Sequence, residues 1–152
     1  MDQTARPTPI IPALGKFSDW LSEYSYPLFR FAMGIALVPH GLHAVFGAFK
    51  VPAVKNFAEA DSWLTASGWI YYLGQLEVIG GICIAIGLLT RFFAIQVVIF
   101  LLVATFAVHL PNGYFWTARG VEWPLSWLVF FLGILLHGGG RLSVDRAIGA
   151  EI

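Results

Sequence analysis

The chain has 152 residues, of which 58% are hydrophobic and 12% are charged, and its formal net charge is zero. Because a soluble domain carries about 25% charged residues, this composition excludes an ordinary water-soluble domain and predicts one domain whose surface faces lipid. The neutral balance and the lack of a basic run give no indication of nucleic-acid binding.

The first 25 residues predict a cytoplasmic tail followed by a short amphipathic helix. Residues 1–12 are polar and contain three prolines, a pattern typical of an extended tail and not of a signal peptide. Beyond them, aromatic and apolar residues recur at helical spacing at Phe17, Trp20, Leu21 and Tyr24. Such a helix is expected to lie in the membrane interface, although a helix packed on protein has the same pattern.

Four apolar segments follow that are long enough, or nearly so, to cross a bilayer as helices. They cover residues 26–49, 69–89, 92–110 and 121–137. The longest connection, residues 50–68, has the pattern of an amphipathic surface helix.

The predicted fold class is therefore all-α, an integral membrane four-helix bundle with short amphipathic interfacial helices. The four-helix domain is expected at residues 26–145, after an N-terminal segment at 1–25 and before a C-terminal cytoplasmic tail at 146–152.

The distribution of Lys and Arg predicts the orientation. Four spans place both termini on one side, which carries Arg6, Lys16, Arg91, Arg141 and Arg146, with Arg30 near its edge. The other side has Lys50, Lys55 and Arg119. Because positive residues are enriched in cytoplasmic segments, both termini are expected in the cytoplasm and the chain in a bacterial-type inner membrane.

Small residues mark the faces on which the helices are expected to pack. Gly34 and Gly41 lie on one stripe of the first span, and Gly74 and Gly81 on one stripe of the second. Such stripes let helix backbones approach closely. The single cysteine, Cys83, is expected to be a small packing residue.

Ionisable residues inside the spans indicate a functional site. Burying such a group at the centre of a membrane helix costs about 2.5–3.5 kcal/mol, so it usually faces the bundle interior. Counting about 1.5 Å of rise per residue places five of them in one layer of the outer half of the membrane. They are His40, His43, Glu77, His109 and Glu122.

These five residues have different expected roles. Glu77 and His40 are the candidates for proton transfer, and His40, His43, His109 and Glu122 are the candidates for cofactor binding. The alternative is that the histidines only join helices by hydrogen bonds, and that His109 and Glu122 are ordinary boundary residues.

Two further polar residues have structural expectations only. Arg30 lies near the cytoplasmic edge and is expected to snorkel to the lipid headgroups. His137 precedes three glycines and is expected to cap the end of a helix.

Metal and haem sites are the competing interpretations of the polar layer. Three histidines and two carboxylates also suit a metal, and two histidines suit haem. The chain contains no HExxH, CxxCH or ExxH motif, so neither a metal nor a haem is predicted.

Three motifs resemble those of the DoxX family of small four-helix membrane proteins. The first span reads R-F-A-M-G-I-A-L-V-P-H-G, close to that family's pattern of Arg, Gly and His-Gly. The second reads G-Q-L-E-V-I-G-G and closes on G-L-L-T-R, and the chain nears its end on G-G-G-R-L-S-V-D. Members often have a lysine three residues after the histidine of His-Gly, where this chain has His43.

The resemblance implies a membrane component of a redox system. Members are associated with a quinol oxidase, with thiosulfate:quinone oxidoreduction and with thiol or oxidative-stress handling. The leading hypothesis is a membrane subunit of a quinone-linked oxidoreductase, in contact with a redox subunit or a second copy of itself. The alternatives are a non-enzymatic anchor or assembly subunit, and a small oligomeric transporter or proton pathway around Glu77.

Overall fold

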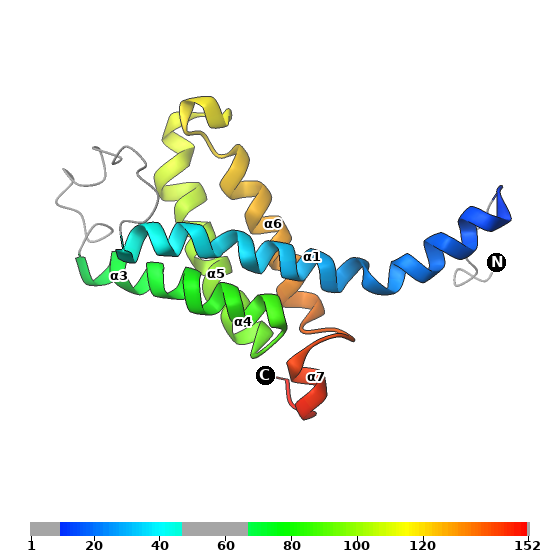
Figure 1. Cartoon of the computed structure of the whole chain (residues 1–152). Helices are drawn as coiled ribbons and strands as arrows, with labels where there is room; N and C mark the ends of the chain where they lie inside the picture. Colours follow the sequence, from blue (N-terminus) through cyan, green and yellow to red (C-terminus); the bar gives the residue numbers. More distant parts are fainter. Residues whose placement is uncertain (1–9, 47–66, 152) are drawn as a thin grey trace.

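The computed structural model describes residues 10–46 and 67–151, and every regular element in these ranges is helical (Figure 1). The predicted all-α fold is therefore confirmed. The surface helix predicted at residues 50–68 lies almost wholly outside the described residues, as do Lys50 and Lys55.

Within residues 10–46 and 67–151, three helices are long and apolar enough to cross a membrane. The first is α1 (Pro12–Phe46). The second consists of α3 (Ser67–Gln75), a π-helical turn η2 (Leu76–Gly80) and α4 (Gly81–Ile86). The third consists of α5 (Thr90–Val103), a π-helical segment η3 (Ala104–His109) and the short 3₁₀ turn η4 (Leu110–Asn112).

The fourth apolar helix, α6 (Glu122–His137), has 16 residues. At 1.5 Å per residue it is about 24 Å long, shorter than a hydrocarbon core of about 30 Å. The 3₁₀ turn η5 (Trp116–Ala118) lies in the loop before α6, and α7 (Val144–Ile148) follows it and spans the predicted domain boundary at residue 145. Four crossings thus remain a prediction, whereas the three longer helices meet the length requirement.

Helix α1 is continuous where two separate helices were predicted. It runs from Pro12 through both the amphipathic stretch and the first span, and its N-terminal part extends beyond the other helices (Figure 1). Residues 17–26 contain no glycine or proline to end a helix, and Pro27, at the predicted junction, lies within α1 without ending it. In addition, Trp20 stacks edge-on against Tyr24 one turn later, with ring centroids 5.6 Å apart.

The glycine stripes bring α1 against the second helix, as the sequence predicts. A Cβ at Gly34 would lie 2.5 Å from the carbonyl oxygen of Gly81, and one at Gly81 would lie 2.7 Å from the carbonyl oxygen of Gly34. Further along the same contact, a Cβ at Gly41 would lie 2.8 Å from the backbone nitrogen of Val78. Real Cβ atoms do not come this close to backbone, so only glycine permits the observed separation.

The apolar core lies among α1, α4, α5 and α6. The side chains of Leu37, Ile84 and Val97 are almost completely buried, and Phe131 and Ile134 of α6 pack against them. The core therefore joins all four apolar helices.

A polar cluster closes the end of the bundle at which α4 turns into α5. The buried carboxylate of Asp145 accepts hydrogen bonds from the backbone N–H groups of Leu89 and Thr90, at 2.6 and 3.0 Å, and from the Thr90 hydroxyl at 2.7 Å. It thereby caps the first turn of α5, where the backbone N–H groups have no partner within the helix.

Arg30 belongs to this cluster, so the prediction that it snorkels to lipid headgroups is wrong. Its residue is 2% exposed, and its guanidinium donates hydrogen bonds to the carbonyls of Gly139, Ala85 and Leu142. Ala85 lies in the last turn of α4, and Gly139 and Leu142 lie in the connection between α6 and α7, so these carbonyls provide acceptors inside the protein.

His137 does not cap α6 as predicted. Its ring lies against that of Tyr26, with centroids 3.8 Å apart, and it is the Tyr26 hydroxyl that donates to the carbonyl of Gly138. Tyr26 of the first helix therefore satisfies the helix end, and His137 supports the tyrosine.

We expect Gly81→Leu to lower the melting temperature or prevent folding, because the new side chain would meet the backbone of α1. The matched control is Gly133→Leu in α6, where an added Cβ meets no atom within 4 Å. This control should melt at or above the parent, because glycine in a helix costs about 1 kcal/mol. Thermal melts of the purified proteins in detergent make the comparison. Equal destabilisation by both substitutions would show that the α1–α4 contact is not close.

Candidate functional site

A cavity of about 380 Å³ lies among α1, η2, α5–η3 and α6, and we call it the central cavity. Its lining combines three ionisable side chains, two tryptophans and five apolar residues. They are His40, Glu77, His109, Trp123, Trp127, Leu37, Phe100, Leu101, Ala104 and Pro124. Three of the five residues predicted for the polar layer therefore line the same cavity.

Glu77 reaches the cavity from the π-helical turn η2. A π-turn inserts an extra residue into a helix and occurs frequently at functional sites. Within the described residues, the structure shows neither a hydrogen bond nor an ion pair to the Glu77 carboxylate. A carboxylate with no protein partner in a mainly apolar cavity lowers the stability of the fold. Such residues in membrane helices usually mark functional sites.

His40 comes from α1 and lies next to Gly41, one of the residues at which α1 touches the second helix. Its ring meets Trp127 of α6 edge-to-face, with centroids 5.6 Å apart and an interplanar angle of 84°. This aromatic contact fixes the ring on one side and leaves its nitrogens for hydrogen bonding.

His109 ends the π-helical segment η3 and is oriented by the loop before α6. Its Nδ1 lies 2.7 Å from the carbonyl oxygen of Arg119. Because a carbonyl only accepts, Nδ1 must carry a proton, and in the neutral ring Nε2 is then an acceptor.

The π-helical geometry explains why His109 faces the cavity. In an α-helix, a residue five positions after Ala104 lies about 140° around the helix axis. In a π-helix, the i→i+5 hydrogen bonding brings residues five apart much closer to one face. Ala104 and His109 accordingly line the same cavity.

The structure does not bring Glu122 or His43 to the lining of the central cavity. Glu122 accepts a hydrogen bond from the backbone N–H of Trp116, at 3.0 Å, and its own backbone N–H donates to the carbonyl of Tyr114. It therefore orders the loop that holds His109. His43 lies on α1 three residues beyond His40.

The two tryptophans of the lining were not predicted as site residues. Trp123 and Trp127 are four residues apart and so share one face of α6. This spacing was visible in the sequence, but aromatic residues near span ends also serve as interface anchors, which hides a second role.

No group of three or more His, Cys, Asp and Glu side chains within the described ranges is placed to hold a metal ion. The central cavity instead has three polar side chains from three helical elements in an otherwise apolar and aromatic lining. Such a mixture is typical of a site for an organic ligand.

Comparisons with known proteins agree with the membrane fold. The sequence model of the DoxX family matches residues 27–110, which include His40, Glu77 and His109. An uncharacterized protein of Haemophilus influenzae is 34% identical over 100 residues, which cover 65% of this chain and 62% of that protein. The match thus spans under two thirds of the relative's length. No solved structure matches significantly.

We expect Glu77→Gln to melt at or above the parent at pH 8, because an amide removes an unpaired carboxylate from an apolar cavity. Glu122→Ala should melt lower, because Trp116 loses its acceptor, at a cost of about 1 kcal/mol. Thermal melts of the three proteins make the comparison. A larger loss of stability for Glu77→Gln than for Glu122→Ala would show that Glu77 holds the fold together.

Proposed function

The chain belongs to the DoxX family of membrane proteins, and from this premise we propose that it is a membrane subunit of a quinone-linked oxidoreductase. Family members are often linked to oxidoreductase or stress-related functions. One observation carries the proposal. Two imidazoles and a carboxylate from three separate helices line one otherwise apolar cavity within a protein that contacts lipid.

The central cavity fits the ring of a quinone. Ligand pockets have volumes of about 300–1,000 Å³, and about 380 Å³ lies within this range. A quinone ring is flat and apolar, with a carbonyl acceptor on each of two opposite edges. Trp123 and Trp127 offer aromatic faces, and His40 offers an N–H donor to a carbonyl.

The side chains of the cavity are suited to binding and to proton movement. A bound quinone accepts two electrons, here from a redox partner protein, and two protons to become a quinol. Glu77 is the proton donor and acceptor within the cavity, because its carboxylate has no structural hydrogen bond among the described residues to break. His40 positions a carbonyl of the quinone by a hydrogen bond. His109, which lies between the cavity and the loop that contains Arg119, is the proposed route for protons to the outside.

The proposal also specifies the orientation of the chain in the membrane and the source of the electrons. The bias of Lys and Arg supports the proposal that both termini lie in the cytoplasm of a cell with a bacterial-type inner membrane. The central cavity then opens in the half of the bilayer away from the cytoplasm. The electron donor is a redox subunit that contacts this chain or a homo-oligomer of it.

We expect His40→Phe to weaken the binding of a tail-less quinone, 2,3-dimethoxy-5-methyl-1,4-benzoquinone, by about tenfold, because phenylalanine keeps the ring's bulk but removes its hydrogen bond. The matched control, His43→Phe, should bind within about twofold of the parent, because His43 does not line the cavity. Quenching of tryptophan fluorescence in detergent measures the affinity.

Two results would contradict this expectation. Equal binding by His40→Phe and the parent would place the quinone elsewhere. Failure of the parent to bind, together with a stoichiometric protein retained on purification, would favour the anchor or assembly subunit.

The orientation is tested with single cysteines at the two ends of α6, in a protein whose Cys83 is replaced by serine. Arg119→Cys should react with an impermeant maleimide in intact cells, and Arg141→Cys should react only after the membrane is opened. Arg119 and Arg141 are both exposed, so a difference in labelling reports the side of the membrane and not burial within the protein. The opposite labelling pattern would reverse the assigned orientation.

A further inference from the structure

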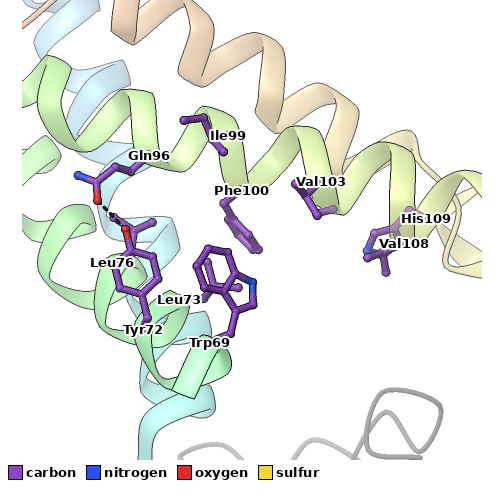
Figure 2. A pocket seen from close by; sticks show the side chains of 11 residues that line it. Trp69, Tyr72, Leu73, Leu76, Gln96, Ile99, Phe100, Val103, Val108 and His109 are labelled. Carbon is purple, nitrogen blue, oxygen red and sulfur yellow. Dashed lines mark hydrogen bonds between the residues drawn. The ribbon is translucent and has the colours of Figure 1, made fainter. Parts of the chain in front are cut away.

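A second cavity of about 390 Å³ lies between α3 and α5–η3, and we call it the side cavity (Figure 2). Its walls are mainly apolar and aromatic. Figure 2 shows Phe100 projecting from α5 between the helices, with Trp69 and Leu73 on the facing wall. Nothing in the proposed reaction uses this space.

The two cavities adjoin along one strip of the third helix. Phe100, Ala104 and His109 line both the central and the side cavity. An occupant of one cavity therefore lies against the same three residues as an occupant of the other.

Two polar side chains of the side cavity, Tyr72 and Gln96, are hydrogen-bonded within the protein. The hydroxyl of Tyr72 donates to Oε1 of Gln96 at 2.7 Å (Figure 2). Nε2 of Gln96 donates to the carbonyl of Phe92 at 3.0 Å. An amide in the middle of an apolar span is costly unless it is paired in this way. With these groups paired, the rest of the lining is apolar or aromatic apart from His109.

The side cavity also reaches the outer surface of the bundle. Trp69, Tyr72 and Ile99, which line it, are 40%, 43% and 55% exposed. In a membrane-spanning bundle this surface faces lipid, so a long apolar chain can pass from the cavity into the bilayer.

We propose that the side cavity holds the first part of the isoprenoid tail of a quinone whose ring lies in the central cavity. This inference rests on the proposed function and names its substrate class as long-chain prenylated quinones. A tail attached to the ring must leave the central cavity through an apolar passage. Phe100, Ala104 and His109 line both cavities, so the side cavity adjoins the central one, and it has the exposed side chains of Tyr72 and Ile99 in its lining.

The test compares a tail-less benzoquinone with the same ring carrying two isoprene units. Val103→Phe fills the side cavity without touching the central one, because Val103 lines only the former. We expect it to weaken binding of the prenylated quinone by about tenfold and to change binding of the tail-less ring by less than about twofold. Leu102→Phe, on the neighbouring exposed position, should bind both quinones as the parent does.

The outcomes separate the two proposals. If the parent does not bind the tail-less ring, the proposed function fails and this inference fails with it. If the parent binds the ring but Val103→Phe affects both quinones equally, or neither, the tail lies elsewhere and only this inference is overturned. Should Val103→Phe not fold, Leu73→Phe on the facing wall provides the same comparison.

Discussion

The close backbone contact between α1 and the second helix is the constraint on which the site depends. Gly34 and Gly81 face each other at a distance that no larger side chain permits. About two turns further along α1, Gly41 makes a second such contact with the backbone of the second helix. His40 adjoins Gly41, and Glu77 lies between the contact points at Gly74 and Gly81. A wider separation of these helices would move the imidazole away from the carboxylate.

The polar residues that stabilise the fold and those proposed for function lie in different parts of the bundle. At one end of the bundle, Arg30 and Asp145 are buried and hydrogen-bonded to backbone groups of helix ends and of the connection between α6 and α7. This cluster uses the residues of the G-L-L-T-R and G-G-G-R-L-S-V-D motifs, so those motifs are explained by folding. Around the central cavity, by contrast, Glu77 has no structural partner among the described residues. The free energy it costs is consistent with a role in chemistry.

Sequence periodicity was sufficient to predict an all-helical fold, the glycine contacts and the similar depth of His40, Glu77 and His109, because rise per residue follows from simple geometry. It was not sufficient for the π-helical segments, which rotate Glu77 and His109 without any mark in the apolar pattern. Arg30 was misassigned because its acceptors lie 55 to 112 residues away in the chain. Depth alone predicts Glu122 as a site residue, but its carboxylate accepts a hydrogen bond from the backbone N–H of Trp116 in the adjoining loop.

The most direct measurement is to locate the ring of a bound quinone by photolabelling. A photoreactive benzoquinone, cross-linked to the purified protein and mapped by mass spectrometry, should label Trp123, Trp127 or Leu101, which line the central cavity. Labelling should fall when unlabelled quinone competes. Labels confined to exposed residues outside the cavity, such as Ile82 or Ile86, and insensitive to competition, would contradict the assignment of the central cavity as a quinone site.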